Sequence, residues 1–204
     1  MKKVKGLLKL LLIFFIILIV DYAFETRDHK WESGHVTIQG KEITLPISVT
    51  EFEKTTGITI SDSDDMFRYI YFGDYDDKGE CGASVQAYVV DNMVRGIKAD
   101  NKTYNGTVDK GVEVFVQFPE GVNTGMTIKK IDKKYKTGWF QFYRRSSKEE
   151  SVEYVSPDTK EIWFVNTFVK YSGSDYDIDI KEHRSKDKTT NRLGTTLEIF
   201  YYCK

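Results

Sequence analysis

The sequence has few of the residues on which small catalytic and metal centres are built. Among its 204 residues there are only two cysteines and three histidines. Two cysteines exclude a disulfide-rich mini-protein and a four-cysteine zinc site. No G-x-S-x-G, H-E-x-x-H, P-loop or dinucleotide-binding motif occurs. We therefore expect no cofactor, no metal and no identifiable catalytic residue, and the sequence favours a protein that is not an enzyme.

The chain also lacks an excess of charge of either sign. Its 30 basic and 31 acidic side chains give a net charge of −1, which argues against binding of nucleic acid. Aromatic residues make up 14% of the sequence. Because aromatic side chains bury a large area on folding, this content excludes an intrinsically disordered chain. The length suits one domain or two small ones.

The N-terminal segment differs from the rest of the sequence. It carries four lysines and no acid, and then eleven apolar residues from Leu10 to Val20. A basic flank before a short apolar run is the layout of a secretory signal. The run is shorter than the ~20 residues of an ordinary membrane-spanning helix, although flanking charges can snorkel around a short span. Removing this +4 segment from the net −1 leaves a charge of −5 on residues 21–204.

Whether the segment is removed depends on a cleavage site. The nearest small residue is Ala23, and Asp21 two positions earlier fits such a site poorly. The sequence thus favours an uncleaved signal-anchor over residues 1–24, with a removed signal peptide or a buried core helix as alternatives. The positive-inside rule then places the rest of the chain outside the cytoplasm of a single-pass protein of the cell membrane, or in the medium after cleavage.

An exported location changes the meaning of the two cysteines. Outside the cytosol, Cys81 and Cys203 could form a disulfide that closes a loop of more than 100 residues. Two free thiols are the alternative, and the sequence does not favour either.

The exported part is dominated by residues that alternate between apolar and polar. A polar linker is expected over residues 25–35, and strands are expected at 36–46, 68–72, 84–90, 112–118, 138–143, 161–171, 176–180 and 195–203. Two short helices interrupt them, one capped by Ser48 and ending near Gly57, the other capped by Thr127 with Ile131 and Tyr135 on its buried face. This pattern predicts an α+β fold of mostly antiparallel strands.

The two helical regions have a similar order of features. Each has a glycine, a strand, a proline and a capped helix, with Pro46 and Ser48–Thr56 in one copy and Pro119 and Thr127–Lys136 in the other. We expect two similar modules, 36–110 and 111–204, although a chance match explains the pattern as well.

The turn that opens the second helix has a further resemblance. Gly125, Met126 and Thr127, with Ile131 four residues on, resemble the tandem helix-plus-sheet modules of β-lactamase-inhibitor-like proteins and small envelope-assembly lipoproteins. The overall layout is also similar to exported proteins of Gram-positive bacteria. The resemblance implies a partner-binding fold and brings no catalytic residue.

Acidic residues concentrate between residues 61 and 80. Seven acids against two basic residues give this segment a charge of −5; the acids are Asp62, Asp64, Asp65, Asp74, Asp76, Asp77 and Glu80. Solvated turn carboxylates explain the cluster best, because the calcium-loop pattern that begins at Asp74 has a lysine at its fifth position. A carboxylate-based hydrolase outside the cytoplasm is the alternative function.

Basic residues concentrate between residues 127 and 148, where the charge is +7. A solvated helix face explains them, and the alternative is a surface for lipid head groups, an anionic envelope polymer or an acidic protein. The candidate binding residues are Lys129, Lys130, Lys133, Lys134, Trp139, Arg144 and Arg145. Our leading hypothesis is a membrane-anchored binding module at the bacterial cell surface, acting through a sheet face or this basic helix.

Overall fold

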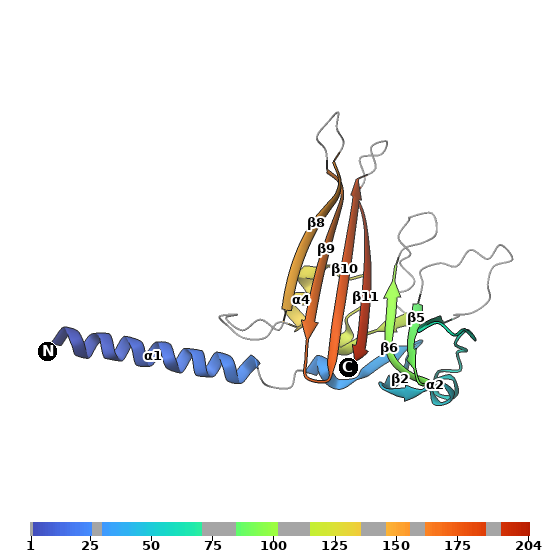
Figure 1. The fold of residues 1–204 in the computed structure, drawn as a ribbon, viewed down its shortest axis with the longest axis horizontal. Coiled ribbons are helices and arrows are strands. Elements are labelled where there is room, and N and C mark those ends of the chain that lie inside the picture. Colours follow the sequence, from blue (N-terminus) through green and yellow to red (C-terminus); the bar gives the residue numbers. More distant parts are fainter. Residues whose placement is uncertain are drawn as a thin grey trace.

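The computed structural model describes residues 2–25, 30–70, 85–101, 115–135, 146–155, 162–186 and 193–204. They form an α+β fold whose strands are antiparallel, as the sequence predicts (Figure 1). The helices are α1 (Lys2–Glu25), α2 (Val49–Thr56) and α4 (Ile128–Tyr135), with the short 3-10 helices η1 (Lys30–Ser33) and η2 (Pro119–Gly121). The strands are β1 (His35–Ile38), β2 (Lys41–Thr44), β3 (Ile47–Ser48), β4 (Phe67–Tyr69), β5 (Val85–Val90), β6 (Met93–Asp100), β7 (Val116–Gln117), β8 (Ser146–Val155), β9 (Ile162–Ser172), β10 (Tyr176–Lys186) and β11 (Leu193–Cys203).

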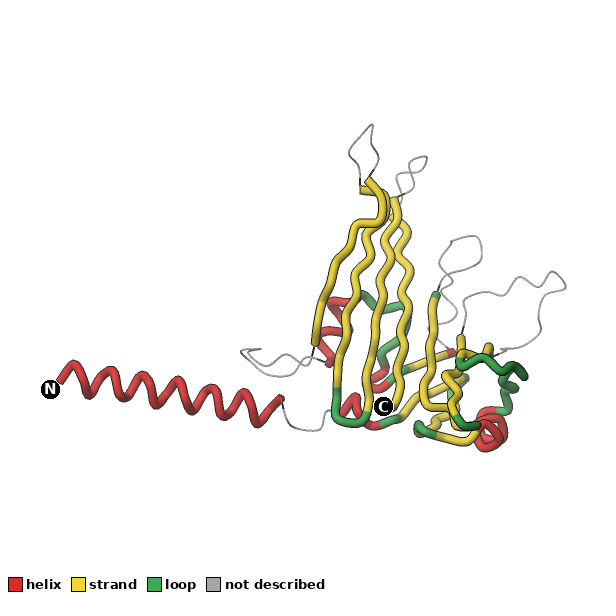
Figure 2. Tube along the Cα trace, in the orientation of Figure 1, coloured by secondary structure: helices red, strands yellow, loops and turns green. Residues whose placement is uncertain are grey.

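The main sheet has eight strands and the small sheet three. The main sheet runs β4-β5-β6-β11-β10-β9-β8, with β3 also paired to β6, and the small sheet runs β2-β1-β7. Figure 2 shows the four long strands β8 to β11 side by side as the tallest part of the molecule. Strands from both predicted modules share the main sheet, because β6 pairs directly with β11 over five residue pairs. The predicted module boundary near residue 110 lies outside the described residues.

Local capping explains both short helices. The side chain of Ser48 accepts a hydrogen bond from the backbone of Glu51 (3.2 Å), and Gly57 ends α2 with a left-handed backbone. The Thr127 hydroxyl accepts from the backbone of Lys130 (3.4 Å) at the start of α4. The predicted caps at Ser48 and Thr127 are thus confirmed.

The core lies between the main sheet and a layer formed by the small sheet, α2 and α4. Successive side chains of a strand point to opposite faces. Alternate residues in the lower part of β9, β10 and β11 therefore enter this core, among them Val169, Ile178 and Ile199. From α4, Ile131 and Tyr135 are buried, and the Tyr135 ring packs edge-on against Tyr171 of β9 (5.4 Å between centroids). We call this covered side of the main sheet its inner face.

The segment after α1 corrects the predicted linker. Trp31 in η1 is only 3% exposed, and its ring lies 5.9 Å from that of Tyr135. Residues 30–35 therefore belong to the folded domain. The prediction was wrong here because one tryptophan among polar residues carries no periodicity, although its large apolar area is available for burial.

Two tyrosines of the main sheet hold this segment in place. The Tyr201 hydroxyl accepts from the backbone N–H of Gly34 (2.9 Å) and donates to the carbonyl of Trp31 (3.0 Å). Tyr176 stacks on Tyr201, and its hydroxyl donates to the carbonyl of Leu45 (2.6 Å). Gly34 has φ +75°, and a Cβ there would lie 2.5 Å from the Tyr176 hydroxyl, so only glycine fits.

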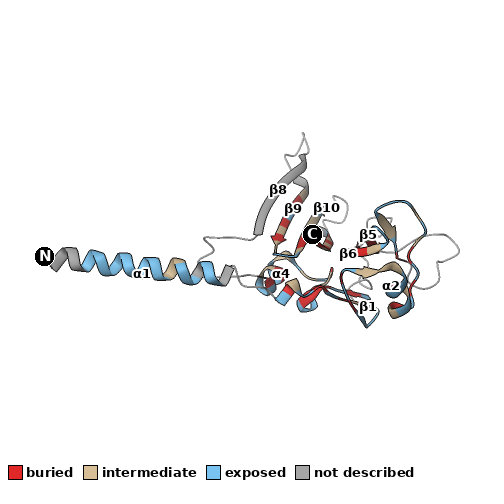
Figure 3. Cartoon of the chain, turned by 60° about the horizontal axis from the view of Figure 1, so that its bottom comes forward, coloured by how far each residue is buried: buried red, intermediate tan, exposed pale blue. Residues whose placement is uncertain are grey.

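Helix α1 extends away from the rest of the chain. In Figure 3 its described side chains are exposed almost throughout, and the exposed large apolar residues from Leu7 to Val20 are 48% to 69% accessible. Within the described part of the chain, no helix combines the length and hydropathy of a membrane-crossing segment.

Cys203 is buried at the end of β11. Its thiol donates to the carbonyl of Arg95 (3.1 Å), and burial raises its pKa. Cys81 lies outside the described residues, so the disulfide between them stays a prediction.

We expect Tyr201→Phe to lower the free energy of unfolding by about 1–3 kcal/mol, because the buried groups of Trp31 and Gly34 lose their partner. Burial also raises the pKa of Tyr201 in the folded state above its value of about 10 in the unfolded chain. The stability that this difference contributes is complete below pH ~10 and is lost as the pH rises further, because the unfolded state then releases the proton first.

Urea unfolding between neutral and strongly alkaline pH measures both effects. The variant should be less stable at neutral pH, and its stability should fall less steeply above pH ~10 than that of the unmodified protein. Tyr69→Phe is the control, since this ring is exposed in β4. If the stability of Tyr201→Phe and that of the unmodified protein fell equally steeply above pH ~10, the raised pKa of Tyr201 would not contribute to the alkaline loss of stability.

Candidate functional site

The outer face of the main sheet is uncovered by the elements that the structure describes. None of the described helices or strands lies over β9, β10 or β11 on the side opposite α4 (Figure 1). The register brings side chains from distant parts of the sequence into rows across this face. One row joins Phe67, Tyr88, Gly96, Tyr202 and Asp177.

The next rows follow at intervals of two residues along each strand. The second row joins Gln86, Lys98, Phe200, Asp179 and Lys170. The third joins Asp100, Glu198, Lys181 and Phe168. Aromatic and charged residues are thus the main components of the face from β4 to β9. We call this set of three rows the outer-face ladder.

Four aromatic rings of the ladder touch one another. The centroid of Phe200 lies 5.3 Å from that of Phe67, 5.7 Å from that of Tyr88 and 4.4 Å from that of Tyr202, on which it stacks. Gly96 makes this possible, because a Cβ there would lie 2.6 Å from the Cβ of Tyr202 and 3.0 Å from the Phe200 ring. A glycine in the middle of a strand usually weakens it, and here the ring of Phe200 covers the gap.

Lysines lie against these rings. The ammonium groups of Lys98, Lys170 and Lys181 are 5.3–5.5 Å from the ring centroids of Phe67, Tyr202 and Phe168. Cation–π contacts of this kind contribute about 0.5–1 kcal/mol each at exposed sites. These contacts fix the positions of the ammonium groups relative to the aromatic rings. Such preorganisation lowers the entropy that a surface loses when it binds a partner.

The ladder carries charges of both signs, with three lysines and four carboxylates. Lys98 pairs with Glu198 (3.2 Å), and Lys170 with Asp177 (3.0 Å) and Asp179 (3.4 Å). A hydrogen bond to the Tyr202 hydroxyl and the two carboxylates raise the pKa of Lys170. Paired charges of both signs suit a partner with its own mixed charges, and they do not form the positive field that a polyanion needs.

The predicted basic residues lie elsewhere, on the solvent side of α4. Lys129, Lys130, Lys133 and Lys134 are exposed there, and Lys134 also donates to the carbonyl of Glu120 (2.6 Å). The other predicted members of the site, Trp139, Arg144 and Arg145, lie outside the described residues.

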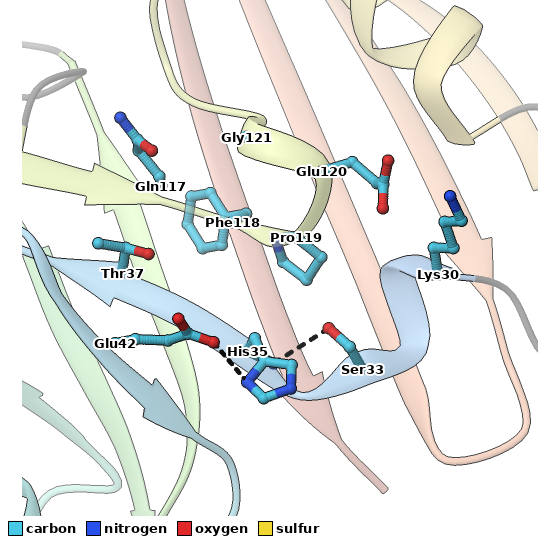
Figure 4. Close-up of a pocket in the computed structure, with 10 residues that line it drawn as sticks. All are labelled: Lys30, Ser33, His35, Thr37, Glu42, Gln117, Phe118, Pro119, Glu120 and Gly121. Atoms are coloured by element: carbon cyan, nitrogen blue, oxygen red, sulfur yellow. Dashed lines mark hydrogen bonds and ion pairs between the residues drawn. The ribbon is translucent and has the colours of Figure 1, made fainter.

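A shallow depression of about 460 Å³ lies beside η1 and the small sheet (Figure 4). Its lining includes His35, whose Nδ1 lies 2.9 Å from a carboxylate oxygen of Glu42, and Ser33. These residue types could form a nucleophile, a base and an orienting acid, but the Ser33 hydroxyl accepts from the backbone N–H of His35 (3.3 Å). Because the hydroxyl does not contact the ring, the arrangement does not activate a nucleophile.

The acidic segment shows no convergence in its described part. Asp62, Asp64 and Asp65 are exposed, and Asp74, Asp76, Asp77 and Glu80 lie outside the described residues. Within the described ranges, no group of three or more His, Cys, Asp or Glu side chains could hold a metal ion. The hydrolase alternative therefore stays a prediction from the sequence alone.

Comparison with family models, with curated proteins and with solved structures finds no match for this chain.

The sequence indicated a sheet face in general terms but did not identify the ladder. Strand β6, which carries Gly96 and Lys98, was not predicted, because a central glycine and three charged residues weaken its alternation. Strand β8 was also missed, since its first half reads as a polar loop. The signal that could have found the ladder is the run of β11, where Phe200, Tyr202 and Glu198 occupy one side of a strand.

We expect Asp177→Asn to destabilise the fold by about 1–3 kcal/mol, because Asp177 is the buried carboxylate between Lys170 and Lys204. Its side chain is 8% exposed, against 45% for Asp179 on the same strand face. Asp179→Asn is therefore the matched control, with an expected loss below about 1 kcal/mol. Urea unfolding at neutral pH measures the free energy of unfolding of both variants. Equal losses would show that the burial of Asp177 does not increase its contribution to stability.

Proposed function

We propose that this chain is a membrane-anchored binding module of the bacterial cell surface, and that it contacts a protein partner through the outer-face ladder. The observation that carries the proposal is a broad sheet face on which aromatic rings and lysines are fixed in contact, with none of the described elements covering it. Aromatic rings with few rotatable bonds lose little entropy when a partner covers them, and they dominate the energy of many interfaces.

The nature of the partner follows from the charges. Each lysine of the ladder pairs with a carboxylate or lies over a ring, so an anionic polymer would meet four acids and only three lysines there. A protein surface with interleaved charges fits better. The inhibitor-like resemblance of the Gly125–Thr127 turn agrees with this reading as an analogy of fold only.

The anchor is proposed from α1. Its apolar side chains project in all directions and remain exposed, which costs free energy in water and none in lipid. The lysines before the apolar run favour a cytoplasmic N-terminus, which leaves the sheets outside.

We expect the full chain, expressed in its own cells, to stay in the membrane pellet after alkaline carbonate extraction and to keep its N-terminal residues by intact mass. A chain in which Ile13 and Ile16 are both replaced by Glu should be released, because each acid in the apolar run costs roughly 2.5–3.5 kcal/mol to insert. Replacing both with Leu is the control. Recovery of a chain that begins after residue 20 would instead establish a removed signal peptide.

We expect a photo-reactive phenylalanine analogue at position 168 to form a discrete cross-linked product in intact cells. Phe168 lies at the end of the ladder, and Phe115, next to the small sheet, has the same 39% exposure. The analogue at position 115 is therefore a matched control that should form no such product. Mass spectrometry identifies the partner, and cross-linking from position 115 alone would move the binding surface away from the ladder.

A further inference from the structure

We propose that the exposed lysines of α4 contact anionic lipid head groups of the membrane that holds α1. We call Lys129, Lys130 and Lys133 the α4 lysine face. The inference rests on the anchor proposed above and assigns a ligand class to the basic residues that the sequence singled out.

The first step is the length of the tether. Helix α1 ends at Glu25 and η1 begins at Lys30, so five peptide steps separate them. Even a fully extended chain spans at most about 18 Å over five residues. If α1 is embedded in lipid, η1 therefore stays close to the membrane surface whatever the path of residues 26–29.

The second step is the attachment of α4 to η1. The rings of Trp31 and Tyr135 are 5.9 Å apart, and the carbonyl of Trp31 is held by the Tyr201 hydroxyl (3.0 Å). Tyr135 in turn donates to the carbonyl of Pro119 (2.9 Å). Helix α4 is thus fixed to the point where the anchor enters the domain, and Figure 1 shows it on the side of the sheets nearest α1.

The third step is the charge that α4 presents. Its apolar residues Ile131 and Tyr135 face the core, and Asp132, its one acid, accepts a hydrogen bond from the Tyr171 hydroxyl (3.1 Å). Lys134, which is not part of this face, donates to the backbone carbonyl of Glu120 (2.6 Å). The lysine face is therefore turned to solvent, whereas Asp132, the single acid of α4, is directed toward β9.

Proximity decides among the possible anionic ligands. A lysine near an anionic bilayer gains roughly 1 kcal/mol, an effect that fades within a screening length of about 8–10 Å. A soluble polymer must be recruited from solution, whereas the tether gives the lysine face a high effective concentration relative to the head groups. Because α4 packs on the inner face of the main sheet, such contact leaves the outer-face ladder directed away from the lipid.

The test is acetylation of the full chain in nanodiscs, with the rate at each lysine read by peptide mass spectrometry. One set of nanodiscs is phosphatidylcholine, and the other is one third phosphatidylglycerol. Lysines that contact phosphate groups should react more slowly, by on the order of fivefold each at low salt, in the anionic discs. The protection should disappear at high salt. Lys41 on β2 and Lys54 on α2 are internal controls, since both are exposed on elements far from α4 in Figure 1.

A pair of variants tests whether the lysines act together. In Lys129→Gln with Lys133→Gln, the remaining Lys130 should lose most of its protection, because the whole face no longer holds to the lipid. In the control variant with both Lys41→Gln and Lys54→Gln, Lys130 should stay protected from acetylation in the anionic discs. Circular dichroism of both variants checks that the fold is unchanged.

Each other outcome overturns the proposal in a distinguishable way. Equal acetylation of the lysine face in both kinds of disc, with the chain incorporated, refutes lipid contact and leaves the anchor standing. Failure of the chain to enter either disc refutes the anchor and this inference with it. Protection in phosphatidylcholine discs by added soluble polyglutamate, without protection by phosphatidylglycerol, would assign the lysines to an anionic polymer instead.

Discussion

The hydrogen bonds of one buried hydroxyl determine how the domain is assembled. Tyr201 lies in β11, near the middle of the main sheet, and binds the backbone of both Trp31 and Gly34. It thereby joins the segment that follows α1 to the last strand of the chain, 170 residues away in sequence. Beside it, Tyr176 binds the carbonyl of Leu45 after β2, and Tyr171 binds Asp132 of α4, so that tyrosines of the main sheet fix the whole inner layer. A phenol suits the task because its ring fills the core while its hydroxyl satisfies two backbone groups.

The alternation of side chains along the strands then separates two roles. Residues such as Ile178 and Ile199 point inward and hold the layers together, whereas their neighbours Asp179 and Phe200 point outward into the ladder. The same strands supply stability on one side and a patterned surface on the other. Substitutions at exposed positions of the outer face, such as Phe168, can therefore change recognition with little effect on the core, whereas the buried carboxylate of Asp177 also contributes to stability.

The sequence predicted the features that depend on neighbouring residues. The caps at Ser48 and Thr127, the buried Ile131 and Tyr135, and the strands rich in β-branched residues all follow from patterns within ten residues. Features that depend on distant partners were not predicted. The Trp31 ring packs near that of Tyr135, and the Tyr201 hydroxyl holds its carbonyl. Strand β6 forms because β5 and β11 pair on either side of Gly96. The lysines of α4 could be identified from charge alone, but their relation to the anchor required the contact between η1 and α4.

The attachment at Tyr201 also defines where mechanical load enters the domain. Any tension transmitted through residues 26–29 reaches the fold at Trp31 and Gly34 and passes into β11, which has β10 hydrogen-bonded on one side and β6 on the other. An edge strand can be peeled away one hydrogen bond at a time, whereas a central strand is released only when its bonds on both flanks break together. A domain held by this segment is therefore loaded at a strand that is hydrogen-bonded on both sides.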